Sequence, residues 1–266
     1  MLPDPIIKLG KIEIYMYGVM IAVGILAAFT VLFLYGKKLR VSEKFLDFVF
    51  YNGIFAIVLG FGSAALFQAT YEYIENPEGG FHLGQGITFI GGLIGGVAAF
   101  LLVYFILRKR LAGRLIEVLS IAPCCITIAH ALGRVGCFFA GCCYGRETTC
   151  ALGVKFPHLS TTVHPTQLYE AAFLFVLFGI MSFLVLKFAF RHNMSVYLVA
   201  YGIFRFLIEF VRNDDRGQLV AGISPSQFWS IGMVIIGIVL FFALEKIYKK
   251  NAPEINSESQ AEANES

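Results

Sequence analysis

The chain has 266 residues, of which 58% are hydrophobic and 15% charged, and its mean hydropathy is +0.74. Soluble domains contain about 45–50% apolar and about 25% charged residues, so these values exclude an ordinary soluble protein. The formal net charge of +3 is too small to indicate a nucleic-acid partner. The composition indicates an integral membrane protein.

Seven apolar segments are long enough to cross a bilayer. A helix needs about 20 mostly apolar residues to cross the hydrocarbon core, and only helices or closed barrels satisfy their backbone groups there. The expected spans are Tyr15–Tyr35, Phe45–Ala69, Ile87–Leu107, Ile116–Phe139, Leu168–Phe190, Val196–Val211 and Ile223–Leu244. We therefore predict an all-α, polytopic membrane domain over residues 1–250. No small-residue cleavage site follows the first span, so we expect it to stay in the membrane.

Loop charge predicts the orientation. Most of the 21 basic residues lie in the first, third and fifth loops and just after the last span. Because cytoplasmic loops carry the excess of Lys and Arg, we expect the N-terminus outside and the C-terminus in the cytoplasm. Residues 251–266 are acidic and contain no aromatic residue, which predicts a disordered cytoplasmic tail.

The segment GRVGCFFAGCCYGR (Gly133–Arg146) combines arginine, glycine and cysteine at the outer end of an apolar span. An arginine at lipid depth costs about 2.5–3.5 kcal/mol at a helix centre, so Arg134 is a candidate functional residue. The alternative is an interfacial anchor. His130 lies four residues earlier, hence on the same helical face, although a lone histidine in an apolar helix is more often a core residue.

The sixth span continues as YGIFRFLIEFVRNDD (Tyr201–Asp215). Arg205 and Glu209 are four residues apart and share a face, and Glu209 can also pair with Arg212. One interpretation is a buried ion pair that locks helices together. The interpretation we favour is that Glu209 orients Arg205, and that Arg134 and Arg205 clamp one phosphate, for which the planar guanidinium is suited.

Two further segments have both a structural and a functional interpretation. FIGGLIGG (Phe89–Gly96) contains small-xxx-small pairs, which favour close helix packing or the approach of a lipid headgroup to bare backbone. HPTQLYEA (His164–Ala171) is an ordinary helix start or a group of polar residues that holds other side chains in place.

All but one of the six cysteines lie within Cys124–Cys143, and the sixth is Cys150. The spacing Cys137-x4-Cys142-Cys143 does not match a zinc motif, so we predict neither a metal site nor a cofactor. A structural role is favoured for all six, with a disulfide between Cys150 and Cys142 or Cys143 as an outside-facing option.

These segments, in this order, resemble the prolipoprotein diacylglyceryl transferase family. The likeness also includes YMYGVMIAVG (Tyr15–Gly24) and GISPSQFWSIGM (Gly222–Met233). It implies a multi-pass enzyme of the bacterial inner membrane that moves the diacylglyceryl group of phosphatidylglycerol to the lipobox cysteine of a preprolipoprotein signal peptide. Its partners would be these two substrates and membrane lipids, with no nucleic acid.

The motifs and the resemblance together give the candidate site. The candidate catalytic residues are Arg134, Arg205, His130 and Glu209. The candidate substrate-binding residues are Tyr17, Gly92, Gly136, Gly141, Glu170, Tyr201 and Arg212.

The chain departs from the family pattern near Arg134. Ile90 stands where the family has a histidine, Cys137 and Ala140 replace two asparagines, and Cys142 replaces a glutamate. The usual base is therefore missing, with His130, His164 or Glu170 as substitutes. The alternatives are the same donor with another acceptor, or a non-enzymatic lipid-binding protein or transporter. A retinal protein is disfavoured because the seventh span lacks a lysine.

Overall fold

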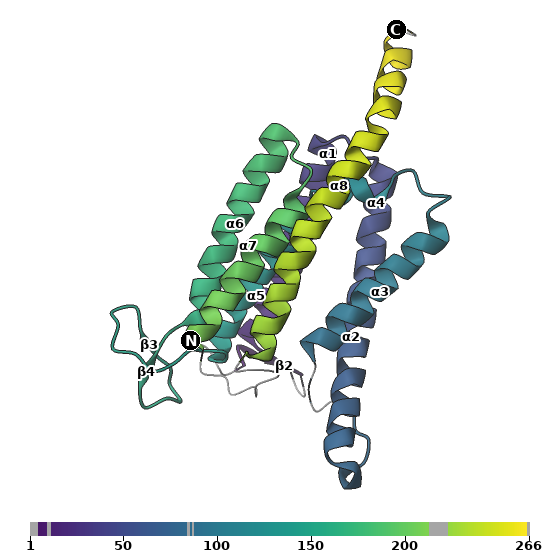
Figure 1. Cartoon of the computed structure of the whole chain (residues 1–266). Coiled ribbons are helices and arrows are strands. Elements are labelled where there is room, and N and C mark those ends of the chain that lie inside the picture. Colours follow the sequence, from purple (N-terminus) through teal and green to yellow (C-terminus); the bar gives the residue numbers. More distant parts are fainter. Residues whose placement is uncertain (1–4, 10–11, 84–85, 87, 213–222, 265–266) are drawn as a thin grey trace. The chain divides into compact units, whose positions relative to one another are not determined.

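The computed structural model describes residues 5–9, 12–83, 86, 88–212 and 223–264 (Figure 1). Its helices are α1 (Met16–Lys38), α2 (Glu43–Glu75), α3 (Phe89–Leu107), α4 (Leu115–Val118), α5 (Ala122–Ala140), α6 (Thr166–Phe188), α7 (Asn193–Ile208) and α8 (Pro225–Asn264), with short 3-10 turns η1 (Pro77–Gly79) and η2 (Glu209–Val211). Two short antiparallel hairpins pair β1 (Ile7–Leu9) with β2 (Ile12–Ile14) and β3 (Val154–Lys155) with β4 (Thr162–Val163).

Seven of the helices in the described ranges are long and apolar enough to cross a membrane. This confirms the predicted all-α fold with seven transmembrane helices. Three predicted spans differ clearly from the observed helices, and in one of them α8 continues beyond Leu244. The second helix continues to Glu75 instead of ending at Ala69. The predicted span Ile116–Phe139 is broken into α4 and α5, since Pro123 in the first turn of α5 cannot donate the backbone hydrogen bond that would continue a helix from α4.

The end of α8 includes residues 251–264, where the sequence predicts a disordered tail. The division into a membrane domain and a disordered tail stays a prediction. Residues 213–215 and Gly222, which belong to segments singled out above, lie outside the described residues.

The chain divides into two compact units, and the larger comprises Met1–Tyr35 and Leu119–Ser266. In this first unit α5 packs against α6 and α7, and α7 packs along α8, as Figure 1 shows. Helix α1 crosses α5 closely: a Cβ on Gly24 would lie 3.0 Å from the carbonyl oxygen of Ala129. Small residues permit this approach, which in lipid is a main source of helix association.

A buried amide holds three segments of the first unit together. Asn193, at the start of α7, is fully buried, and its Nδ2 donates to the carbonyls of Ser120 and Met181 at 3.1 Å each. A buried polar side chain is stabilising only when it is hydrogen-bonded. Asn193 thereby fixes the end of α7 that is remote from the polar residues described below.

The second unit, Gly36–Val118, is built on the α2–α3 pair. Its crossing uses glycines on both helices: a Cβ on Gly60 would lie 3.0 Å from the Gly92 carbonyl oxygen. Ser63 Oγ donates to the Gly91 carbonyl at 2.9 Å, and Asn52 Nδ2 donates to that of Phe100 at 3.0 Å. The FIGGLIGG segment therefore serves close helix packing.

Candidate functional site

The candidate residues of the first unit gather where its helices share one end. They come from the start of α1, from α5 and the loop after it, from the start of α6, and from α7 and the turn η2 that follows it. This follows from the alternating direction of successive helices, which brings motifs far apart in sequence to the same end.

A buried carboxylate organises the first half of the site. Glu170 on α6 is 1% exposed, and its Oε2 lies 3.0 Å from Arg134 Nε on α5. Its Oε1 accepts a 2.7 Å hydrogen bond from the Tyr201 hydroxyl on α7 and lies 3.4 Å from His130 Nε2. The Tyr201 ring packs edge-on against His130 and stacks on Tyr197. Glu170 thus joins three helices.

The Glu170 contact leaves most of the Arg134 guanidinium for a ligand. The pair is formed through Nε, and the Nη groups make no side-chain hydrogen bond to the described residues. A guanidinium has five N–H donors in a planar fork, which suits two oxygens of a phosphate. The Arg134 side chain keeps 18% of its surface exposed, so a ligand can reach it.

A second carboxylate organises the other half. Glu209, in the turn after α7, accepts a 2.8 Å hydrogen bond from Arg205 Nη1 on its Oε2. Its Oε1 accepts one of 2.9 Å from Ser224 Oγ at the start of α8, and Arg212 Nε lies 3.8 Å from Oε2. The predicted pairing of Glu209 with Arg205 and Arg212 is confirmed. Glu209 therefore links Arg205 to Ser224 at the start of α8.

The two clusters adjoin along α7. Tyr201, which contacts Glu170, and Arg205 are four residues apart and lie on one face of the helix, separated by about 6 Å of axial rise. Arg134 and Arg212 also act electrostatically on the same thiol, Cys143. Arginines from α5 and from the end of α7 therefore face a common region.

The loop after α5 closes this region, and its course is set by the helix end. Gly141 adopts a left-handed conformation (φ 70°), its N–H bonds to the Phe138 carbonyl, and the N–H of Cys142 bonds to that of Cys137. This is a Schellman motif, which needs glycine because a side chain is strained at this φ. Buried Thr166 and Gln167 then donate to the carbonyls of Cys143 and Cys142.

At Gly145 the backbone of this loop lies very close to the neighbouring segments. It forms an isolated bridge with Arg212, and a Cβ placed on it would lie 2.5 Å from the Val211 carbonyl oxygen and 2.8 Å from Thr166 Cγ2. The loop is thus pressed between the end of α7 and the start of α6.

We expect Gly145→Ala to destabilise the protein by about 1–3 kcal/mol, because the added methyl group overpacks against backbone. Thermal unfolding in detergent measures this loss. Gly179→Ala on α6 is the matched control, since its Cβ meets nothing within 4 Å and the helix gains propensity. Equal melting temperatures for the two variants would contradict the tight packing at Gly145.

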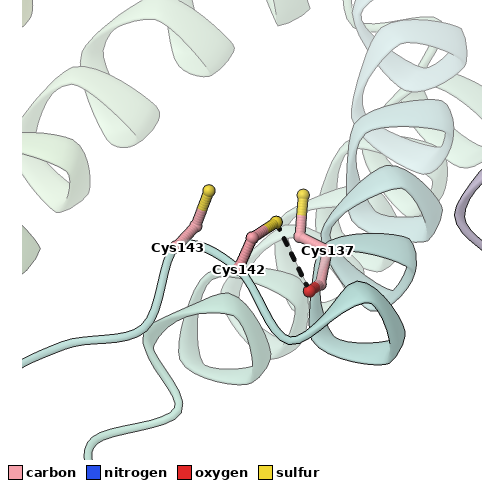
Figure 2. A group of neighbouring side chains, drawn as sticks. All are labelled: Cys137, Cys142 and Cys143. Atoms are coloured by element: carbon pink, nitrogen blue, oxygen red, sulfur yellow. Dashed lines mark hydrogen bonds between the residues drawn. The ribbon is translucent and has the colours of Figure 1, made fainter. Parts of the chain in front are cut away.

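Three thiols converge at the same helix end. The Sγ atoms of Cys137, Cys142 and Cys143 all lie within 4.8 Å of one another. Figure 2 shows the three side chains pointing the same way, with Cys137 on α5 and the other two on the loop. All six cysteines of the chain are free, so the disulfide considered for Cys150 is not formed in the structure.

The thiols of the loop differ in acidity. Hydrogen bonding with Cys137 and Cys142 lowers the pKa of the Cys143 thiol, and the positive charges of Arg134 and Arg212 act in the same direction. Hydrogen bonding with Cys137 and Cys143 raises the pKa of the Cys142 thiol instead. Cys143 is therefore the more acidic of the two loop thiols.

The remaining candidates fall into two groups. Tyr17, at the start of α1, packs over Gly136, whose Cβ would lie 3.2 Å from the Tyr17 ring, so both border the Arg134 region. Gly141 shapes the loop as described. Gly92 lies in the second unit, in the α2–α3 crossing, and its predicted role in substrate binding stays a prediction.

Comparison with known proteins places the chain in a family. The sequence pattern of the prolipoprotein diacylglyceryl transferase family matches residues 5–243. The chain belongs to this family. Its curated relatives include the phosphatidylglycerol–prolipoprotein diacylglyceryl transferase of Clostridium tetani (strain Massachusetts / E88), which is 35% identical over 244 residues covering 88% of this chain and 94% of the relative.

Two further relatives belong to the same family. An enzyme of the same name, numbered 2, from Clostridium perfringens (strain 13 / Type A) is 33% identical, covering 88% of this chain and 94% of the relative. One from Methylobacillus flagellatus is also 33% identical, covering 89% and 95%. The resemblance drawn from the motifs is confirmed.

Sequence reasoning missed two features of this family member. Thr166 and Gln167 hold the backbone of the cysteine loop, whereas the sequence pointed to a helix start or to polar groups that hold other side chains. The convergence of the three thiols was also missed. The glycine that follows an apolar helix was the available signal, because a Schellman turn brings the residue after it back over the last helical turn.

Proposed function

We propose that this chain is a phosphatidylglycerol–prolipoprotein diacylglyceryl transferase of the bacterial inner membrane, with its N-terminus outside. The observation that carries the proposal is the pair of arginines, Arg134 and Arg205, which two buried carboxylates hold on facing helices of a chain matched to this family almost from end to end.

The donor binds through its phosphate. Phosphatidylglycerol carries one phosphodiester charge, and the guanidinium groups of Arg134 and Arg205 supply charge-assisted hydrogen bonds to its oxygens. Both arginines keep only 11–18% of their side-chain surface exposed. In such a site, shielded from water, an ionic contact is worth far more than at a surface.

The reaction is a substitution at the glycerol carbon that bears the phosphate. The sulfur of the lipobox cysteine forms a bond to this carbon, the carbon–oxygen bond to phosphate breaks, and glycerol phosphate leaves. The thiol loses its proton. Negative charge grows on the departing phosphate, so fixed positive charge that contacts it lowers the barrier. Arg134 and Arg205 have this role, and Glu170 and Glu209 act as positioning residues.

A second candidate is the same donor with another acceptor. It is favoured by the changed surroundings of Arg134, where cysteines stand in the loop that borders the phosphate region. The two candidates share the arginine pair and differ in the acceptor.

Complementation separates the two candidates. Expression in a bacterial strain depleted of its own transferase should restore growth and lipidation of its lipoproteins, with an Arg134→Ala variant as the inactive control. Failure of the wild-type chain to restore either, at membrane levels equal to those of a working transferase, would contradict prolipoprotein as the acceptor and support the second candidate.

A further inference from the structure

The three-thiol cluster at the end of α5 takes no part in the proposed contacts to the donor phosphate. Cys137, Cys142 and Cys143 place their sulfurs within 4.8 Å of one another, and they project to one side of the loop (Figure 2). The cluster differs from Cys124, which is fully buried in α5 and lies outside it. Cys142 is exposed and the other two are partly exposed, so the cluster is open to a ligand.

We propose that Cys137, Cys142 and Cys143 bind one Zn²⁺ ion, and that the fourth position of this ion takes the cysteine thiolate of the acceptor. The second half of this statement rests on the proposed transferase function. The first half stands on the cluster itself.

The geometry fits zinc with small movements. A tetrahedral zinc ion with Zn–S bonds of about 2.3 Å holds its sulfurs about 3.8 Å apart. The observed separations of up to 4.8 Å close to this value by side-chain rotation of about 1 Å. Three protein ligands leave one position open, which distinguishes a reactive zinc site from a closed structural one.

The loop backbone holds the three sulfurs close together without a bound ion. The Schellman turn at Gly141 folds Cys142 back over Cys137, and Cys143 is held at φ 64°, in the left-handed region that side chains rarely adopt. Thr166 and Gln167, both buried, fix the carbonyls of the two loop cysteines. Strained conformations held by their surroundings are typical of functional sites.

The charge of the surroundings also fits. Zinc with three or four thiolates carries a net negative charge, and Arg134 and Arg212 lie within electrostatic range of Cys143. Positive charge therefore offsets that of the loaded site. Soft thiolate ligands favour Zn²⁺ and Cu⁺ over hard cations such as Mg²⁺.

A bound zinc ion would supply the deprotonation of the acceptor thiol. A thiol that coordinates a metal is deprotonated, so the acceptor cysteine would release its proton to solvent on binding. Its sulfur would then form the bond to the glycerol carbon as the carbon–oxygen bond to phosphate breaks. No base and no redox partner is needed, and the zinc ion is unchanged at the end.

Metal binding tests the first half. Purified protein kept reduced in detergent is titrated with Zn²⁺, and with Co²⁺ as a spectroscopic probe. We expect one ion per chain, sulfur-to-cobalt charge-transfer absorption, and protection of Cys137, Cys142 and Cys143 from maleimide labelling by bound Zn²⁺. Each of Cys137→Ser, Cys142→Ser and Cys143→Ser should weaken affinity at least about tenfold, whereas Cys150→Ser should leave it unchanged.

Maleimide labelling uses the wild-type protein. The proposal is therefore tested even if a cysteine variant misfolds. Failure of Zn²⁺ to protect the three thiols, or equal affinity in Cys143→Ser and Cys150→Ser, would overturn the site.

A lipobox peptide tests the second half. Added to the Co²⁺-loaded protein, it should increase the charge-transfer absorption by about one third, as a fourth thiolate joins three, and the same peptide with serine in place of cysteine should not. An unchanged spectrum overturns the acceptor step. Full transfer activity in metal-stripped protein would also overturn the step while upholding the transferase. Metal and peptide binding without any transfer would instead reject the transferase function alone.

Discussion

Replacing Arg134 with alanine is expected to lower the rate of diacylglyceryl transfer about 100- to 1,000-fold. This is the loss usual for removing one donor that stabilises charge in a transition state, which is the role proposed for Arg134. The measurement is the initial rate of lipobox-peptide modification by purified protein in phosphatidylglycerol micelles. Arg191→Ala is the matched control, because Arg191 packs over Tyr248 at the remote end of the same unit.

The Arg134 substitution also has a structural cost, which the experiment must separate from catalysis. Removing Arg134 leaves the Glu170 carboxylate buried without its cation, and breaking a buried pair costs about 3–5 kcal/mol. The double variant Arg134→Ala/Glu170→Gln removes the unpaired charge. It should recover melting temperature but not activity. Recovery of near-normal transfer in either variant would contradict a direct role for Arg134.

Replacing Arg205 with alanine is expected to lower the rate of diacylglyceryl transfer by a similar factor, about 100-fold or more. Arg205→Lys should recover only a small part, because an ammonium group cannot make the paired hydrogen bonds of a guanidinium. Glu209→Gln should lower the transfer rate less, by about tenfold. The amide can still accept from Ser224, but it holds Arg205 through a neutral contact in place of the 2.8 Å ionic one.

Combining the two arginine variants tests whether Arg134 and Arg205 contact the same phosphate. If both arginines contact one phosphate, Arg134→Ala and Arg205→Ala combined should lose less than the product of the two single losses, because residues that act as a unit are not additive. Multiplicative losses in the double variant would show instead that the two arginines act independently.

The sequence predicted features that depend on local spacing. Seven apolar segments of bilayer length predicted seven helices, and Arg205 with Glu209, four residues apart, predicted an ion pair that the structure contains. Family membership also followed from short motifs in a fixed order. These signals do not depend on how the helices are arranged in space.

Contacts between helices could not be predicted in the same way. Arg134 and Glu170 belong to different helices, and no periodicity shows that Glu170 joins Arg134, His130 and Tyr201. The spacing of Cys137, Cys142 and Cys143 did not match a zinc motif because such motifs describe other turns. Here a helix end and a left-handed glycine bring the thiols together.

Incubation of the purified protein with doubly labelled phosphatidylglycerol and a lipobox peptide would show which part of the lipid is transferred. One label is placed in the acyl chains and another in the headgroup glycerol. The account predicts that the acyl label appears on the peptide, attached to its cysteine sulfur, while the headgroup label is released as glycerol phosphate in equal amount. A serine-substituted peptide should acquire neither. Transfer of both labels to the peptide, or of neither by folded protein, would contradict it.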